Sequence, residues 1–243
     1  MTTELQRHDR NTDDGARGQS RRAFLRAAGL GGALLAFPSL FAACSADATR
    51  MLAPGSADAD HLHGGHESGT VVLDFHSDIG VLNYAYALEQ LEAAFYTTVV
   101  AHPYHGMSQQ EMRVLTDVRD HEIVHRDFLK AALGGQAIRG LTPLLGPINF
   151  QSRDEVLNAA RTFEDLGVAA YNGAGRYLRS DVYLGIAGKI VSVEARHASA
   201  IRDLLMPKTG YFAPKAFDDA FAPTTVIAAA SAYIAEKINV VNS

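Results

Sequence analysis

The sequence predicts an all-α protein: a four-helix bundle with one long crossover connection, followed by a further helix near the C-terminus. Three observations lead to this prediction. First, four amphipathic segments are long enough to be helices. Second, the ends of these segments are marked by serine, proline and glycine residues. Third, a Glu-x-x-His motif occurs twice. The two copies, Glu122/His125 and Glu194/His197, are the most informative of these features because they also indicate what the bundle holds.

The helix ends are marked by local signals. Ser108-Gln-Gln-Glu111 and Ser152-Arg-Asp-Glu155 both match the capping box that begins a helix. Pro103, the pair Gly134-Gly135 and Met206-Pro207 follow helix ends. Together these signals predict helices at residues 78–101, 109–133, 153–178 and 182–205.

The connections predict how the helices are joined. The links at residues 102–107 and 179–181 are short, which implies antiparallel neighbours. Between the second and third helices runs a long segment with glycine and proline, residues 134–151. The sequence after each motif is also similar, with an aliphatic residue four positions after the histidine and a basic residue after that. Two helical hairpins related by a pseudo-two-fold axis follow from this pattern.

Each half carries a complete set of potential metal ligands. A Glu and a His three residues apart lie on one face of a helix and can close on one ion. About one helix earlier in each half stands another glutamate, Glu89 or Glu164. All four glutamates lie on apolar stripes, and burying unpaired carboxylates is costly. Two divalent cations would balance the four negative charges, so the sequence predicts a two-metal centre.

Other polar residues near the motifs are interpreted from their spacing. Tyr96 and Tyr171 follow Glu89 and Glu164 by seven residues, which places each behind its glutamate, either as a hydrogen-bond or electron donor or as an ordinary core aromatic. Glu92 lies about 60° from Glu89 around the helix and is interpreted as a boundary residue. Four histidines fit no ligand spacing and are interpreted as surface groups or outer partners of the ligands: His76, His102, His105 and His121.

These motifs resemble the bacterial ferritin-like superfamily, in particular its exported members often labelled desiccation-related. The resemblance covers roughly residues 75–206; residues 82–96 are similar to that family's first helix, and residues 217–234 to its closing helix. It implies that Glu89 and Glu164 are terminal ligands, that Glu122 and Glu194 bridge the metals, and that each metal has one imidazole. These imidazoles would be His125 and His197.

One departure from that family concerns the residue before each bridging glutamate. Relatives often have an aspartate there, hydrogen-bonded to a ligand histidine. Here those positions hold His121 and Val193. Outer partners of this kind orient and tune metal ligands, so this departure argues against vigorous redox activity even if metal binds.

The N-terminus predicts export. Residues 20–26, Ser-Arg-Arg-Ala-Phe-Leu-Arg, match a twin-arginine signal, and an apolar stretch and a small-residue region follow. We assign residues 1–43 to a signal peptide read by the twin-arginine export machinery. The alternative, a membrane helix at residues 27–43, is disfavoured because the segment is short, glycine-rich and broken by Pro38.

Cys44 is the only cysteine, so one chain cannot form a disulfide or a rubredoxin-type iron site. Its context, Leu40-Phe-Ala-Ala-Cys44, resembles a lipobox with Phe41 in place of the usual aliphatic residue. We predict lipidation at Cys44 and a periplasmic or cell-envelope lipoprotein anchored in the membrane. The alternative is cleavage by the ordinary signal peptidase, which would release a soluble periplasmic protein.

The domain organisation follows from these assignments. Residues 44–73 form a flexible linker with three histidines, which either collect metal or belong to a plain tether. The bundle spans residues 74–206, and residues 207–243 form an extension with the fifth helix. A net charge of −5 without basic clusters in the mature chain argues against nucleic acid as a partner.

The functional hypothesis is a dinuclear iron or manganese centre that acts on dioxygen or peroxide. The protein would be an oxidase, ferroxidase or peroxide-consuming protein in stress protection, with Tyr96 and Tyr171 as candidate catalytic residues. The competing hypothesis is a non-enzymatic metal-binding or scaffold protein of the envelope. A homo-oligomer is compatible with the sequence, although a cage of many subunits conflicts with a lipid anchor.

Overall fold

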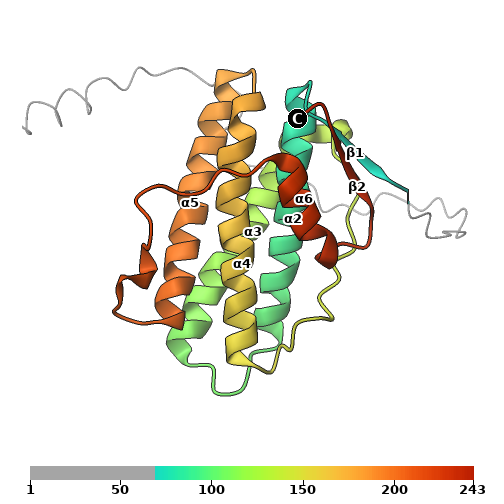
Figure 1. Ribbon diagram of the computed structural model, residues 1–243. Coiled ribbons are helices and arrows are strands. Elements are labelled where there is room, and N and C mark those ends of the chain that lie inside the picture. Colours follow the sequence, from blue (N-terminus) through green and yellow to red (C-terminus); the bar gives the residue numbers. More distant parts are fainter. Residues whose placement is uncertain (1–68) are drawn as a thin grey trace, which may run out of the picture. The chain divides into compact units, whose positions relative to one another are not determined.

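Four long helices form an antiparallel bundle in the computed structural model, which describes residues 69–243. The predicted signal peptide, Cys44 and the three linker histidines lie outside the described residues. Figure 1 shows the bundle. Its members are α2 (Asp78–Ala101), α3 (Gln109–Leu133), α4 (Arg153–Ala174) and α5 (Asp181–Leu205). The predicted all-α class is confirmed, with α2 packed mainly on α3, and α4 mainly on α5.

Serine side chains begin each of these helices. Ser108 forms the predicted capping box, in which its hydroxyl accepts from the Glu111 amide and Glu111 accepts from the Ser108 amide. Ser152 also caps its helix, but the Glu155 carboxylate accepts from the Asn149 amide instead. The third helix was predicted to reach residue 178. It ends at Ala174 because the chain tightens there into a 3-10 turn, Gly175–Tyr177.

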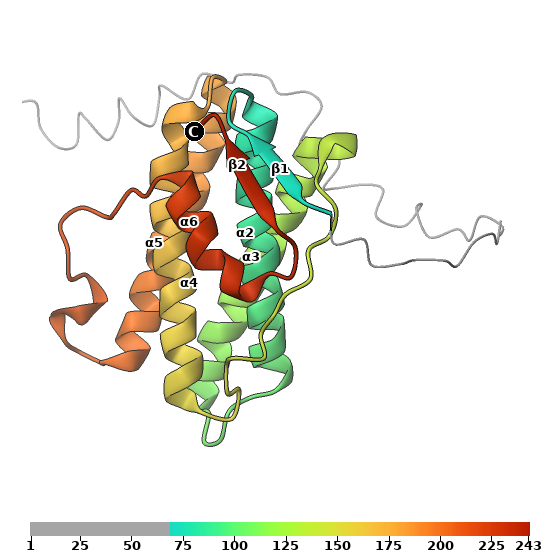
Figure 2. The same ribbon diagram turned by 45° about the vertical axis from the view of Figure 1, so that its right-hand side comes forward.

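The crossover between α3 and α4 runs back along the bundle and is held against α2. The Asn83 side chain donates to the Gln136 carbonyl at 2.9 Å and accepts from the Ile138 amide at 2.7 Å. Gln90, two turns further along α2, accepts from the Leu141 amide. Because the crossover returns to the opposite end, α4 runs antiparallel to α2 (Figures 1 and 2).

The C-terminal extension packs across the bundle. It contains a 3-10 turn (Gly210–Phe212), the short helix α6 (Pro223–Ala230) and a second 3-10 turn (Ser231–Tyr233). The predicted fifth helix is therefore present but shorter than residues 217–234. Gly173 makes the contact with α4 possible, because a Cβ atom there would lie 1.8 Å from the Phe221 carbonyl oxygen. The Phe221 amide donates to the Ala169 carbonyl at the same place.

Two short strands, which the sequence did not predict, tie the ends of the described chain together. β1 (Val71–Asp74) pairs in parallel with β2 (Ile238–Val241), with Val71 opposite Ile238 (Figure 2). Val71 and Leu73 are buried, so residues 71–73, the last of the predicted linker, are part of the folded unit. Both strands are rich in β-branched residues, which favour strands, but each has only four residues and its partner lies at the other end of the sequence.

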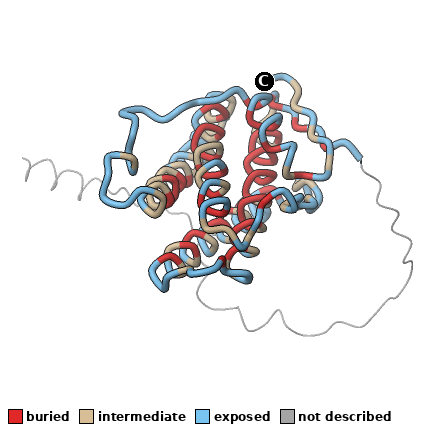
Figure 3. The backbone as a smooth tube through the Cα atoms, turned by 60° about the horizontal axis from the view of Figure 1, so that its bottom comes forward, coloured by how far each residue is buried: buried red, intermediate tan, exposed pale blue. Residues whose placement is uncertain are grey.

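Burial follows the inner faces of the helices (Figure 3). α2 is the most buried helix, since most of its residues, polar ones included, are shielded from solvent. Within residues 69–243, no helix is both long and apolar enough to cross a membrane.

Candidate metal centre

Each of the four bundle helices contributes one glutamate to a common buried layer. Glu89 lies on α2, Glu122 on α3, Glu164 on α4 and Glu194 on α5, and all four are fully shielded from solvent. His125 and His197 lie one turn after the glutamates of α3 and α5 and are also buried. Apolar residues such as Leu115 are buried on the same helix faces as these glutamates and histidines, as the periodicity predicted. The structure thus brings together all six predicted ligands.

The six side chains form two overlapping groups. One consists of Glu89, Glu122, His125 and Glu194, and the other of Glu122, Glu164, Glu194 and His197. Within each group, one ligand atom per residue lies within 4.8 Å of all the others. Glu122 and Glu194 belong to both groups. This sharing is the geometry expected of two carboxylates that bridge a pair of ions.

The two halves have nearly matching distances. His125 Nδ1 lies 2.9 Å from Glu194 Oε1 and 3.6 Å from Glu89 Oε2. In the other half, His197 Nδ1 lies 2.7 Å from Glu122 Oε1 and 3.4 Å from Glu164 Oε2. The predicted pseudo-two-fold arrangement is therefore present in the side chains as well as in the helices.

These atoms converge without forming hydrogen bonds. Both oxygens of Glu122 and Glu194, one oxygen each of Glu89 and Glu164, and Nδ1 of both histidines are buried and lack a hydrogen-bond partner of acceptable angle. A folded protein rarely leaves so many buried polar atoms unsatisfied. Lone pairs that point at a common position are the arrangement that a metal ion requires, so the donor set fits the predicted pair of ions.

Burial and mutual repulsion hold two carboxyl groups near their protonated form. Burial, reinforced by the charge of Glu194, raises the pKa of Glu89 well above its usual value, although His125 opposes this. Burial likewise raises the pKa of Glu164 to about 8, with His197 opposing. Glu122 behaves differently. Burial would raise its pKa, but polar contacts with both histidines lower it to about 2.

The same cluster keeps the two histidines in their charged form. Burial disfavours a charged imidazole, but the surrounding carboxylates outweigh it and raise the pKa of His125 to about 12. Glu122, Glu164 and Glu194 raise the pKa of His197 to about 12 in the same way. Without bound metal, both imidazoles therefore carry protons that balance part of the carboxylate charge.

The two predicted tyrosines each donate a hydrogen bond to a predicted ligand carboxylate. The Tyr96 hydroxyl donates to Glu164 Oε1 at 2.5 Å, and the Tyr171 hydroxyl donates to Glu89 Oε1 at 2.5 Å. Each tyrosine thus serves the glutamate of the opposite half rather than the one seven residues before it. α2 and α4 are in contact across the bundle, so the hydroxyl of the tyrosine on one helix reaches the glutamate of the other.

His121 acts as the outer partner of one ligand. Its Nδ1 lies 2.9 Å from His197 Nε2, and the two rings stack with planes 10° apart. Because His197 turns its Nδ1 toward the carboxylates, its Nε2 is the ring nitrogen that contacts His121. Val193, at the matching position of the other half, has no polar group to offer His125. The other three histidines without ligand spacing, His76, His102 and His105, are exposed, as predicted.

Glu92 is the residue that the sequence interpretation placed wrongly. It is not at a boundary but buried, with 4% of its surface exposed. Its side chain extends toward α4 beside Gly167, where a Cβ atom would lie 3.0 Å from Glu92 Oε1 and 3.6 Å from Glu194 Oε2. Burial and four neighbouring carboxylates raise its pKa well above the usual value. The centre therefore has a fifth glutamate at its edge, outside both ligand groups.

Replacing Glu92 with glutamine should stabilise the metal-free protein at neutral pH. Because the pKa of Glu92 is raised on folding, the folded state binds a proton that the unfolded state releases, so stability falls as pH rises. Removing this group should raise the free energy of unfolding by roughly 1–3 kcal/mol at pH 7.5. The gain should shrink toward pH 5. Denaturant unfolding at both pH values measures it.

The matched control for this variant is Asp117→Asn, which removes one negative charge from the exposed face of α3. It should leave the free energy of unfolding nearly unchanged. A Glu92→Gln protein that is less stable than the parent at pH 7.5 would show that Glu92 is held charged by a favourable environment.

Comparison with known proteins agrees with this geometry. A family model described as "Ferritin-like domain" matches residues 77–207, a range that includes all four bundle helices and all six predicted ligands. A comparison with curated proteins found no match.

Proposed function

This chain belongs to the ferritin-like domain family, and from that premise we propose that its bundle holds a dinuclear iron or manganese centre. In this proposal the protein is an oxidase, ferroxidase or peroxide-consuming protein that uses dioxygen or peroxide in stress protection. The observation that supports it most directly is the sharing of Glu122 and Glu194 between two buried ligand groups. A mixed set of carboxylates and imidazoles suits iron and manganese.

Each side chain has a role in this proposal. Glu122 and Glu194 would be shared by the two ions, Glu89 and Glu164 would each hold one, and one imidazole would complete each set. The hydroxyls of Tyr96 and Tyr171 fix the orientation of the terminal carboxylates through their hydrogen bonds. Iron or manganese at this place would supply the electrons that reduce dioxygen or peroxide. Tyr96 and Tyr171 are near enough to donate a further electron.

Metal analysis of the purified protein, followed by an oxidation assay, tests this function. We expect two iron or manganese ions per chain, as the two ligand groups require, and oxidation of added Fe(II) by dioxygen or peroxide. Failure of correctly folded protein to bind any transition metal in stoichiometric amount would overturn the assignment.

The complete burial of the four carboxylates favours a second candidate, a structural metal site. Structural sites are closed, whereas catalytic sites keep a position for substrate. The same assay separates the two, because a structural site would bind two ions without turnover. In that case the departures at His121 and Val193 would be the first residues to examine, since outer partners tune the ligands.

We also propose export and lipid anchoring, based on the sequence outside the described residues. Changing Arg21 and Arg22 together to lysine should trap the precursor in the cytoplasm, because the export receptor reads both arginines. Cys44→Ala should release the mature protein from membranes, because Cys44 is the only candidate for acylation. Cell fractionation measures both effects. Membrane retention of the Cys44→Ala protein would refute the lipid anchor but leave export intact.

A further inference from the structure

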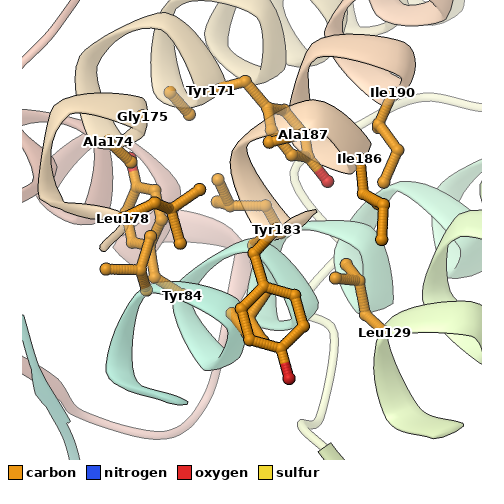
Figure 4. A pocket seen from close by; sticks show the side chains of 15 residues that line it. Tyr84, Leu129, Tyr171, Ala174, Gly175, Leu178, Tyr183, Ile186, Ala187 and Ile190 are labelled. Atoms are coloured by element: carbon orange, nitrogen blue, oxygen red, sulfur yellow. The ribbon is translucent and has the colours of Figure 1, made fainter. Parts of the chain in front are cut away.

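A small apolar cavity borders the metal ligands. It lies at the end of the bundle where α2 begins and α4 ends, between side chains of all four helices (Figure 4). Three of its wall residues stand four positions from a ligand on the same helix: Ala85 from Glu89, Leu129 from His125, and Ile190 from Glu194. Four residues correspond to about 6 Å along a helix. The cavity is therefore the layer next to the ligand layer.

Tyr171 forms the wall between the cavity and the centre. Its ring lines the cavity, and its hydroxyl donates to Glu89 Oε1. Figure 4 shows Tyr171 beside Ala187, with Ile190 and Leu129 further along the wall. A small molecule held here is thus separated from a ligand carboxylate by a single side chain.

The size and the surface of the cavity restrict its occupant. It encloses about 20 Å³, and about 10–15 Å³ suffices for one water molecule. The surface that faces the cavity is apolar throughout, although three tyrosines contribute their rings. Water and hydrogen peroxide would lose hydrogen bonds on entering such a space, whereas apolar cavities of proteins stay dry and accept small apolar molecules.

We propose that this cavity binds dioxygen and supplies it to the metal centre. The inference rests on the proposed function and narrows it, because it makes dioxygen rather than peroxide the oxidant. Dioxygen is apolar and small enough for the space, and it gains dispersion contacts there without giving up hydrogen bonds. In this proposal dioxygen passes from the cavity to the buried centre along the Tyr171 side chain, which borders both.

Xenon binding tests the cavity without any turnover. In crystals of the purified protein pressurised with xenon, we expect a xenon atom between Tyr171, Ala187 and Ile190. Ala187→Leu fills the space from α5 and should abolish this site. Ala174→Val narrows it from α4 and serves as a second variant in case the first does not fold. Ala132→Leu, on the exposed face of α3, is the matched control and should keep the xenon site.

The oxidation assay connects the cavity to the chemistry. In both cavity variants, the apparent KM for dioxygen should rise by roughly fivefold or more, while the rate with added hydrogen peroxide stays within about twofold. The control variant should match the parent protein with both oxidants. This difference between oxidants separates a substrate site from a general loss of stability.

The possible failures are distinguishable. Absence of xenon from the cavity, or an equal loss of rate with both oxidants, overturns the dioxygen site. Turnover of the parent protein with peroxide alone also overturns it but leaves the proposed function in place. If the parent protein oxidises Fe(II) with neither oxidant, the proposed function fails, and a xenon-filled cavity would then be only a packing gap.

Discussion

Glu122→Ala is expected to abolish metal binding at both positions of the centre, whereas His197→Ala should remove only one ion. Glu122 belongs to both ligand groups, and His197 to only one. The affinity for both ions should fall by more than about 100-fold in Glu122→Ala, since losing even an outer partner of a ligand costs 10–100-fold. His197→Ala should retain about one ion per chain. Oxidation of Fe(II) should be lost in both variants, because it needs the pair.

Metal content per folded chain, measured after removal of loosely bound ions, checks this expectation. His105→Ala, which removes an exposed imidazole, is the control and should keep the full metal content. Glu122→Gln keeps the shape of the side chain and guards against a folding defect in the alanine variant. Equal metal loss in Glu122→Ala and His197→Ala would contradict the bridging role of Glu122.

Metal binding is also expected to release protons and to weaken steeply in acid. At neutral pH the imidazoles of His125 and His197, each with a pKa of about 12, are protonated in the metal-free protein and must lose these protons to bind. Glu164, with a pKa of about 8, and Glu89 add to the release. The binding constant for the pair of ions should therefore fall at least about 100-fold for each unit that pH decreases between 8 and 6.

Calorimetry in buffers with different ionisation enthalpies counts the released protons. The parent protein should release at least two per chain, one from each imidazole. The His125→Ala protein, which should still bind one ion, should release one proton fewer than the parent protein. A binding constant that does not change between pH 6 and 8 would mean that the histidines are neutral before metal arrives.

Local signals explain how much of the fold was predictable. Helix starts depend on a cap and the residues next to it, so Ser108 and Ser152 identified two of them correctly. The ligand layer was predictable because residues three apart, as in Glu122/His125 and Glu194/His197, lie on the same face of a helix. The pairing of Val71 with Ile238 had no such signal, since it depends on where the chain returns after the whole bundle has formed.

The parts of the site that were missed or left open depend on distances between helices. Spacing along α2 gave the direction of Glu92 but not its burial, which requires the close approach of α4 at Gly167. The partners of Tyr96 and Tyr171 were likewise set by the neighbouring helix and not by their own. His121 touches His197 from a different helix, a contact that no local pattern encodes.

Glu92 beside Gly167 has a consequence for how such a centre can be assembled. Each hairpin supplies the same set of metal-binding side chains, so two identical hairpins joined as a symmetric dimer could build the ligand layer. The same dimer could not build the edge of this centre. A symmetric dimer would have the same residue at both places. It would have either two glutamates in a space that one carboxylate now occupies, or two glycines that leave the space empty. Covalent linkage of the hairpins lets the halves diverge, and Glu92 with Gly167 is a pair that two identical hairpins cannot provide.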